Sequence, residues 1–191
     1  MDVHAPVDPA LETTALSLAA LKADGPALLM HRPLGSRHPM LGNLFGHRRR
    51  IELALGDRPV GSLRELGRLL ASIREPRWPG SLKDALSQWP ELAQLAHVAP
   101  REVHDAAFND EVIEGDAIDL GRLPIQTCWP GDAGPLITFG LVVTRGPTKR
   151  RENVAIYRQQ PIGPRRVIMR WLAHRGGALD YQDHLRVHPD Q

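Results

Sequence analysis

A chain of 191 residues can form one large domain or one and a half small ones, and its 42% hydrophobic and 24% charged residues are ordinary for a soluble protein. Its formal net charge of only +2 argues against a nucleic-acid partner. The single cysteine, Cys128, excludes an internal disulfide framework. No secretory signal is visible, and no apolar run approaches the roughly 18 residues that span a membrane. We therefore expect a soluble, cytoplasmic protein that can still touch a membrane surface.

The first half of the chain carries mostly helical signals. Asp8 as an N-cap with Pro9 in the first helical position predicts a helix over 9–23. Two short apolar runs, 26–31 and 39–45, predict strands joined by a turn. Capping boxes and apolar periodicity predict further helices from about Ser62, Ser81 and Pro90.

The second half changes to a β pattern. Runs rich in β-branched and aromatic residues predict three antiparallel strands over 135–146, 152–160 and 165–173, followed by a helix over 176–188. We interpret two basic runs, at 47–50 and 148–151, as solvated turns. The predicted fold is α+β, with a helix-rich region over 1–100 and a β-rich region over 101–191 that forms an antiparallel sheet or split barrel.

Charged side chains occupy the last two predicted strands, where a core strand would exclude them. Strand alternation would place Arg170, Leu172 and His174 on one face. One interpretation is an edge pair with a wet face. The other is a phosphate or carboxylate site, because arginine presents a bidentate fork and Gly176-Gly177 lets backbone N–H groups approach an anion.

Other candidate sites carry weaker signals. We interpret Cys128 as a small buried hydrophobe rather than a nucleophile, because no Cys/His arrangement accompanies it. His184 and His188 have the spacing of metal ligands, but nothing in the sequence suggests a third ligand. The phosphate-loop, dinucleotide-binding and zinc-protease motifs are not present.

Two long blocks of the sequence resemble a known family. They are "GDAIDLGRLPIQTCWPGDAGPLITFGLVVTRGP" (115–147) and "ENVAIYRQQPIGPRRVIMRWLAHRGGALDYQDH" (152–184), and the likeness reaches back through 25–56. The chain is similar to the UbiD family of decarboxylases, in particular to the 3-polyprenyl-4-hydroxybenzoate carboxy-lyases of ubiquinone biosynthesis. The resemblance implies an N-terminal piece of such an enzyme and a flavin-binding fold.

The resemblance also implies a site for prenylated FMN and a divalent metal, typically manganese, beside its phosphate. Asn153 matches the family's metal-ligand asparagine, and an amide oxygen suits such a cation. Arg158 matches the active-site arginine that holds the substrate carboxylate. The cofactor-contacting positions implied by the match are Ile156, Tyr157, Arg158, Arg170, Trp171, Leu172, Arg175 and Gly176.

Asn153 and Arg158 have opposite parity on a regular strand, yet the resemblance assigns both to one site. A bulge, or a metal at the strand end, would reconcile the two positions.

The implied reaction is non-oxidative decarboxylation of a polyprenylated aromatic acid, with the modified flavin as electron sink. The family's glutamate metal ligand and acidic proton donor lie downstream of the matched blocks, so we expect little activity from this chain alone. Further implied partners are a flavin prenyltransferase that supplies the cofactor and copies of the same subunit. Two alternatives stay open: a non-catalytic flavin-phosphate-binding module, and a decarboxylase of another aryl or acrylic acid.

Overall fold

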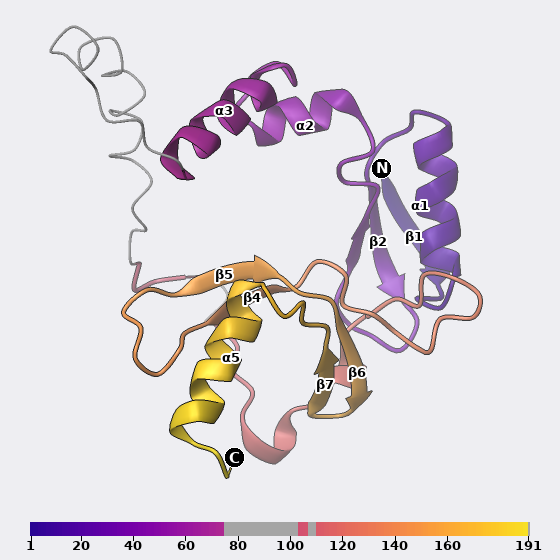
Figure 1. The fold of residues 1–191 in the computed structure, drawn as a ribbon. Coiled ribbons are helices and arrows are strands. Elements are labelled where there is room, and N and C mark those ends of the chain that lie inside the picture. The colour runs from indigo at the N-terminus through magenta and orange to yellow at the C-terminus, as the bar shows by residue number, and fades with distance from the viewer. Residues whose placement is uncertain (75–102, 107–109, 191) are drawn as a thin grey trace, which may run out of the picture. The chain divides into compact units, whose positions relative to one another are not determined.

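The computed structural model describes residues 1–74, 103–106 and 110–190 (Figure 1). The chain divides into two compact units, Met1–His47 with Glu114–Gln191 and Arg48–Ile113. Helices combine with small sheets that contain antiparallel pairs, which confirms the predicted α+β class; the described residues do not close a barrel. The helices predicted from Ser81 and Pro90 lie outside the described residues.

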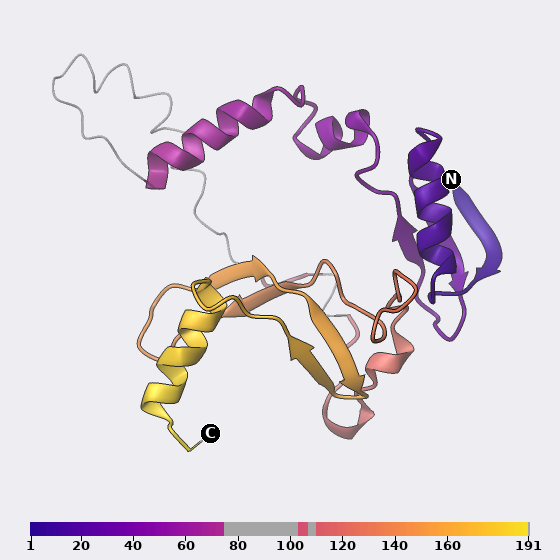
Figure 2. The ribbon, with the colours of Figure 1, turned by 45° about the vertical axis from the view of Figure 1, so that its right-hand side comes forward.

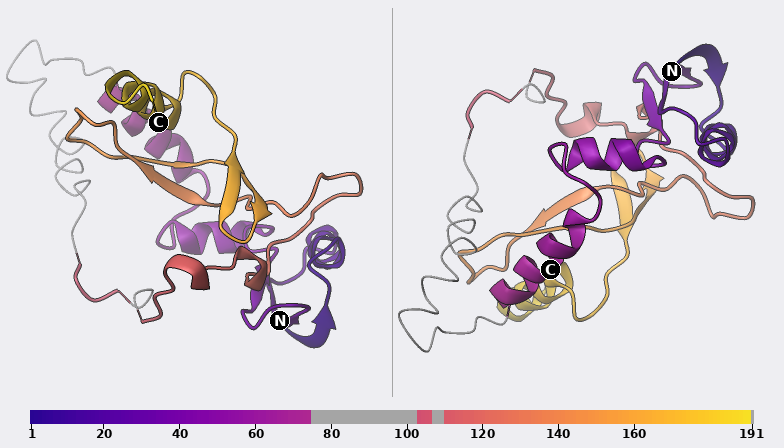
Figure 3. Two further views of the ribbon diagram at one scale, coloured as in Figure 1. Left: turned by 90° about the horizontal axis from the view of Figure 1, so that it is seen from below. Right: turned by 90° about the horizontal axis from the view of Figure 1, so that it is seen from above.

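The first unit begins with a three-stranded sheet and a helix. Strands β1 (Asp2–Val7) and β2 (Leu28–Pro33) pair in parallel, and β3 (Met40–Gly42) is antiparallel to β2. Helix α1 (Glu12–Lys22) forms the crossover that a parallel pair requires, and Figure 3 shows it end-on beside β1. The two predicted strands are confirmed, whereas β1 was not predicted from the sequence.

The start of α1 differs from the prediction of a helix beginning at Pro9. The Asp8 carboxylate accepts a hydrogen bond from the Ala10 N–H at 2.7 Å, which forms a tight local turn instead. Leu11 then adopts a positive φ of 72°, and its N–H donates to the carbonyl of Thr127. This contact with a distant segment delays the helix to Glu12.

The C-terminal part of the first unit contains two strand pairs and a helix, α5 (Gly176–Val187), which confirms the predicted last helix (Figure 2). The three long predicted strands are wrong in extent. Four short ones replace them, with β4 pairing antiparallel to β5 and β6 to β7. Their bounds are Leu141–Thr144 (β4), Asn153–Ile156 (β5), Gln159–Gly163 (β6) and Arg166–Met169 (β7). Two short 3-10 helices precede them, Gly115–Ala117 (η2) and Leu120–Arg122 (η3).

The buried side chains of this unit form two small clusters. Val7 on β1 and Leu28 and Met30 on β2 are the buried apolar side chains of the N-terminal sheet, and Met30 is only 1% exposed. Tyr157 and Ala178 are buried between the β4–β5 pair and α5. The second cluster positions the candidate site, because α5 packs on β4 and β5 there.

The second unit contains two described helices, α2 (Arg48–Ala54) and α3 (Ser62–Arg74). The predicted helix from Ser62 is therefore confirmed. The prediction of a turn at 47–50 is wrong, because Arg48 and Arg49 lie in α2 and both pair with Glu52 one helical turn later.

No helix in the described part of the chain is both long and apolar enough to cross a lipid bilayer.

Candidate anion and cofactor site

A cavity of about 560 Å³ opens where the second half of β5 meets the segments around α5. Six of the nine residues that the sequence singled out line it, and Ala155 is the one further lining residue. These six are Ile156, Tyr157, Arg158, Arg170, Leu172 and Arg175.

Three arginines converge on this cavity. Arg158, Arg170 and Arg175 are all exposed, and among the described residues none of them forms an ion pair with a carboxylate. Other surface arginines of the chain do form ion pairs with carboxylates, as Arg186 does with Asp183 at 3.0 Å. Three guanidinium groups without acidic partners attract an anion of high charge density.

The backbone places Arg158 at the cavity by interrupting a strand. β5 ends at Ile156 and β6 begins at Gln159, so Tyr157 and Arg158 lie between two strands rather than within one. Tyr157 is 6% exposed and anchors the break, while Arg158 points outward. Exposure still alternates from Asn153 to Arg158, and Asn153 does not line the cavity, so the two residues keep the opposite parity expected from the sequence.

Arg170 reaches the same place because β7 ends one residue earlier, at Met169. Its backbone N–H donates to the carbonyl of Arg158 at 3.0 Å, which holds the two arginines side by side. The predicted strand face of Arg170, Leu172 and His174 is wrong, since the chain leaves the strand and turns at His174, whose side chain is exposed.

Trp171 and Gly176, also predicted to contact the cofactor, do not line the cavity. The Trp171 ring stacks on Tyr157 at 5.4 Å between centroids. The Tyr157 hydroxyl accepts a hydrogen bond from the Gly177 N–H at 2.7 Å, which satisfies one of the orphan donors at the start of α5. These contacts fix α5 against the strand break. Whether Trp171 and Gly176 touch a cofactor stays a prediction.

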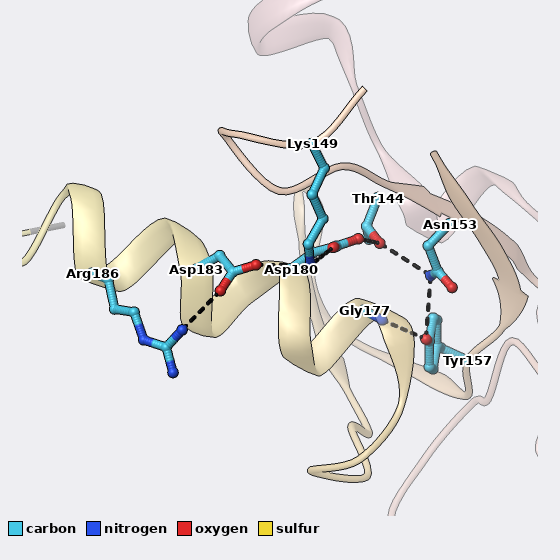
Figure 4. A network of polar contacts seen from close by, with 8 residues as sticks. All are labelled: Thr144, Lys149, Asn153, Tyr157, Gly177, Asp180, Asp183 and Arg186. Atoms are coloured by element: carbon cyan, nitrogen blue, oxygen red, sulfur yellow. Dashed lines mark hydrogen bonds and ion pairs between the residues drawn. The ribbon is translucent and has the colours of Figure 1, made fainter. Parts of the chain in front are cut away.

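Asn153, the predicted metal ligand, lies at the start of β5 with its amide nitrogen engaged. Nδ2 donates to Oγ1 of Thr144 at 3.1 Å and to the Tyr157 hydroxyl at 3.4 Å. Figure 4 shows the amide oxygen turned away from both partners. The carbonyl oxygen is therefore free to coordinate a hard cation, as the metal-ligand prediction requires.

Next to Asn153 lies a polar network centred on the buried Asp180, which the sequence did not indicate. Asp180, 4% exposed, accepts hydrogen bonds from Thr144 and from Lys149, each at 2.8 Å, and Lys149 also pairs with Asp183 at 2.7 Å (Figure 4). Lys149 belongs to the basic run 148–151; a turn is confirmed there, but this lysine is tied to α5 rather than solvated. The only available signal was an acid in a helix that follows a basic turn.

The network shifts the pKa values of Asp180 and Lys149 in opposite directions. Lys149 and then Thr144 hold the pKa of the Asp180 carboxyl below its usual range, and Asp180 followed by Asp183 raises the pKa of Lys149. Asp180 therefore stabilises the fold above about pH 4, the usual pKa of aspartate, and this contribution is lost as the pH falls through its lowered pKa. The contribution of Lys149 is lost only as the pH rises through its raised pKa.

We expect Asp180→Asn to unfold at a lower temperature than the wild type at pH 7, and the difference to shrink as the pH falls below about 4. Thermal unfolding followed by circular dichroism between pH 3 and 7 measures both. A difference that stays constant over this range would show that Asp180 does not act as a charged partner.

The weaker candidates of the sequence analysis do not join this site. Cys128 is a partly exposed free thiol outside the cavity lining. The rings of His184 and His188 lie 4.8 Å apart, but within the described ranges no three His, Cys, Asp or Glu side chains are grouped to hold a metal. A metal beside Asn153 would need ligands from outside such a group.

The arginines of the cavity fit the phosphate of a flavin, and Asn153 offers one oxygen ligand for a divalent cation. The cavity is large enough for part of such a cofactor, its arginines suit a phosphate, and the free oxygen of Asn153 suits Mg²⁺ or Mn²⁺.

Two family descriptions match the chain in its two halves. Residues 1–70 match the 3-octaprenyl-4-hydroxybenzoate carboxy-lyase N-terminal domain, and residues 101–190 match the Rift-related domain of the same carboxy-lyase. The described part of the match contains every residue of the candidate site.

Solved structures agree with this match. The UbiD-class enzyme HmfF from Pelotomaculum thermopropionicum in complex with FMN is 29% identical with a TM-score of 0.72, over 98% of this chain and 36% of that one. An evolved dimeric form of HmfF in complex with prFMN is also 29% identical, with a TM-score of 0.73 over 98% and 38% of the two chains. The vanillic acid decarboxylase of Sedimentibacter hydroxybenzoicus, at 24% identity and a TM-score of 0.66 over 98% and 34%, shares the fold.

This chain thus spans little more than a third of the length of these relatives. The two family matches and the fold together show that it belongs to the UbiD family of carboxy-lyases.

Proposed function

We propose that the chain binds the phosphate end of prenylated FMN and contributes to decarboxylation of 3-polyprenyl-4-hydroxybenzoate to 2-polyprenylphenol in ubiquinone biosynthesis. The observation that carries this proposal is the convergence of Arg158, Arg170 and Arg175, without acidic partners, on one cavity. FMN and prFMN in the HmfF structures support a flavin as the anion. The family description supports the substrate class.

Each residue of the site has a separate task in this proposal. Arg170 and Arg175 hold the flavin phosphate, and Asn153 gives its amide oxygen to a divalent cation, Mn²⁺ in our proposal, beside that phosphate. Arg158 pairs with the substrate carboxylate and orients it until it leaves as CO₂. Prenylated FMN, when bound, supplies the electron sink that the aromatic ring lacks. Ile156, Tyr157 and Leu172 present apolar surface to the cofactor.

FMN binding tests the phosphate site directly. Removing one charge-assisted contact costs about 1.5–3 kcal/mol, so we expect Arg170→Ala to weaken FMN affinity at least roughly tenfold. Arg166→Ala is the matched control, because Arg166 is an exposed arginine of β7 outside the cavity lining. Quenching of flavin fluorescence gives both affinities.

Riboflavin, which lacks the phosphate, provides the second control. It should bind the wild type more weakly than FMN, and Arg170→Ala should leave its affinity unchanged. Equal losses of FMN affinity in Arg170→Ala and Arg166→Ala would contradict the phosphate site, because a general charge effect would then explain both.

The reaction also needs a proton for the product, which we expect a carboxylic acid to supply. No described residue that lines the cavity carries a carboxyl group. We therefore expect this chain, given prenylated FMN, Mn²⁺ and a polyprenyl-hydroxybenzoate, to release little or no CO₂. Brisk turnover measured as CO₂ release would show that the acid lies within this chain and that this account of its role is wrong.

A second candidate function is a flavin-phosphate-binding module without catalysis of its own. The same absence of a carboxyl group among the described lining residues favours it. This candidate would be selected if the chain binds FMN but shows no turnover in any assembly that contains the rest of a UbiD-class enzyme. A third candidate is a decarboxylase of another aryl or acrylic acid, as the vanillic acid specificity in the name of a relative illustrates.

The remaining proposals concern the protein's surroundings. We place it in the cytoplasm, at the inner membrane surface where a polyprenylated substrate resides, with a flavin prenyltransferase supplying its cofactor. We propose self-association because an evolved form of HmfF is described as dimeric. We also propose that the cofactor site belongs to a functional region over 101–191, with 1–100 as the other region.

A further inference from the structure

We propose that Thr144, held by Asp180, is a positioning residue that keeps the Asn153 carbonyl oxygen free for the metal. This inference rests on the proposed function, because it assigns a role toward the same cation. Neither Thr144 nor Asp180 lines the cavity or has a task in the proposed chemistry. Yet Thr144 accepts a hydrogen bond from the Asn153 amide and donates one to Asp180, as Figure 4 shows.

An asparagine side chain needs such control because its two ends are alike in size but opposite in function. One end donates hydrogen bonds through NH₂ and the other accepts them through the carbonyl oxygen. Only the carbonyl oxygen can bind a hard cation. A rotation of the Asn153 amide by half a turn would present the NH₂ group instead and repel the metal.

The choice between the two orientations follows from the charge of Asp180. Its carboxylate is paired with Lys149 at 2.8 Å, so it is ionised and only accepts hydrogen bonds. The single hydroxyl hydrogen of Thr144 is therefore committed to Asp180, at 2.8 Å. Thr144 has only lone pairs left for Asn153, and it selects the NH₂ end, 3.1 Å away.

Tyr157 cannot make this selection. Its hydroxyl accepts from the Gly177 N–H at 2.7 Å but keeps its own hydrogen, so it can act as donor or acceptor toward Asn153. It would tolerate either end of the amide at 3.4 Å. The discrimination therefore lies with Thr144.

Gly176 provides independent support, because it leaves space on the side to which the oxygen points. A Cβ atom on Gly176 would overlap Oδ1 of Asn153 and lie 2.6 Å from its Cγ. Hydroxyl oxygens that accept from the NH₂ group on one side and a residue without a side chain on the other thus frame a single orientation of the amide.

The test measures Mn²⁺ affinity in the presence of saturating FMN, with free Mn²⁺ followed by electron paramagnetic resonance. Asn153→Ala defines the loss caused by removing the ligand. Thr144→Val keeps the shape of the side chain and removes the hydroxyl, and we expect it to weaken Mn²⁺ binding roughly 10- to 100-fold, as loss of an outer-shell partner does. Thr144→Ser keeps the hydroxyl and should restore wild-type affinity.

Two further variants keep the test decisive if Thr144→Val folds poorly. Asp180→Asn can donate to Thr144, which frees the threonine hydrogen for the Asn153 oxygen; the amide then inverts, and Mn²⁺ affinity should fall as in Thr144→Val. Combining Thr144→Val with Asn153→Ala should cost no more than Asn153→Ala alone, since Thr144 acts only through Asn153.

The outcomes distinguish a failure of the positioning role from a failure of the metal site. A loss in Asn153→Ala with no loss in Thr144→Val or Asp180→Asn would overturn the positioning role and leave the metal site standing. Wild-type Mn²⁺ affinity in Asn153→Ala would overturn the metal site and the positioning role together. Equal losses in Thr144→Val and Thr144→Ser would also contradict the proposal, because the hydroxyl would then be irrelevant.

Discussion

Replacing Gly177 with alanine is expected to lower the free energy of unfolding by about 1–3 kcal/mol, the usual cost of forcing extra volume into a packed site. A Cβ atom there would overlap Cζ3 of Trp171 and lie 3.0 Å from Cε2 of Tyr157. The two rings stack on each other, so neither can yield without breaking that contact. The displacement would also weaken the buried hydrogen bond from the Gly177 N–H to Tyr157.

Urea denaturation measures this change. Gly163→Ala in β6 is the matched control, because a Cβ atom on Gly163 meets only Arg166, at 3.9 Å. The control should stay within about 0.5 kcal/mol of the wild type. An unchanged midpoint for Gly177→Ala would mean that the Tyr157–Trp171 stack does not anchor α5.

Replacing Gly176, the neighbouring residue, should damage function rather than stability. Its added Cβ would displace the Asn153 amide, which is the far end of a flexible side chain and can rotate away at low cost. The metal then loses its oxygen ligand, and we expect Mn²⁺ affinity in the presence of FMN to fall on the order of 100-fold. The free energy of unfolding should change less than in Gly177→Ala.

The double variant of Gly176→Ala and Asn153→Ala isolates the cause. If Gly176 acts only by leaving room for Asn153, the second substitution removes the clash and adds no further loss of Mn²⁺ affinity. Wild-type affinity in Gly176→Ala alone would contradict the position of the Asn153 oxygen.

The elements that the sequence predicted well are those whose residues carry their own local signal. α5 begins with a Gly-Gly pair, and β2 begins with the apolar run Leu28–Met30. β1 was missed because polar residues and Pro6 hide its pattern, and its pairing with β2 depends on a segment more than twenty residues away. The strand break at Tyr157 was missed for a similar reason. The Tyr157 hydroxyl is held by the Gly177 N–H of α5, which comes later in the chain.

The residues of the candidate site also fall into those that the sequence could indicate and those that it could not. The arginines and Asn153 could be named because a long sequence block resembles a family, and the structure gathers the arginines at one cavity. Thr144, Lys149 and Asp180 could not be named, because hydrogen bonds that span 31 to 36 residues connect them. Sequence spacing indicates neighbours along a helix or strand, but it does not indicate which distant polar groups satisfy one another.

The central claim is that flavin phosphate and metal meet at one site built by the arginines and Asn153. The most direct measurement is the affinity of the chain for FMN with and without Mn²⁺, in the wild type and in Asn153→Ala. We predict that Mn²⁺ tightens FMN binding to the wild type and that Asn153→Ala removes this coupling while FMN still binds through the arginines. Equal FMN affinity with and without Mn²⁺ in the wild type, or undiminished coupling in Asn153→Ala, would contradict the claim.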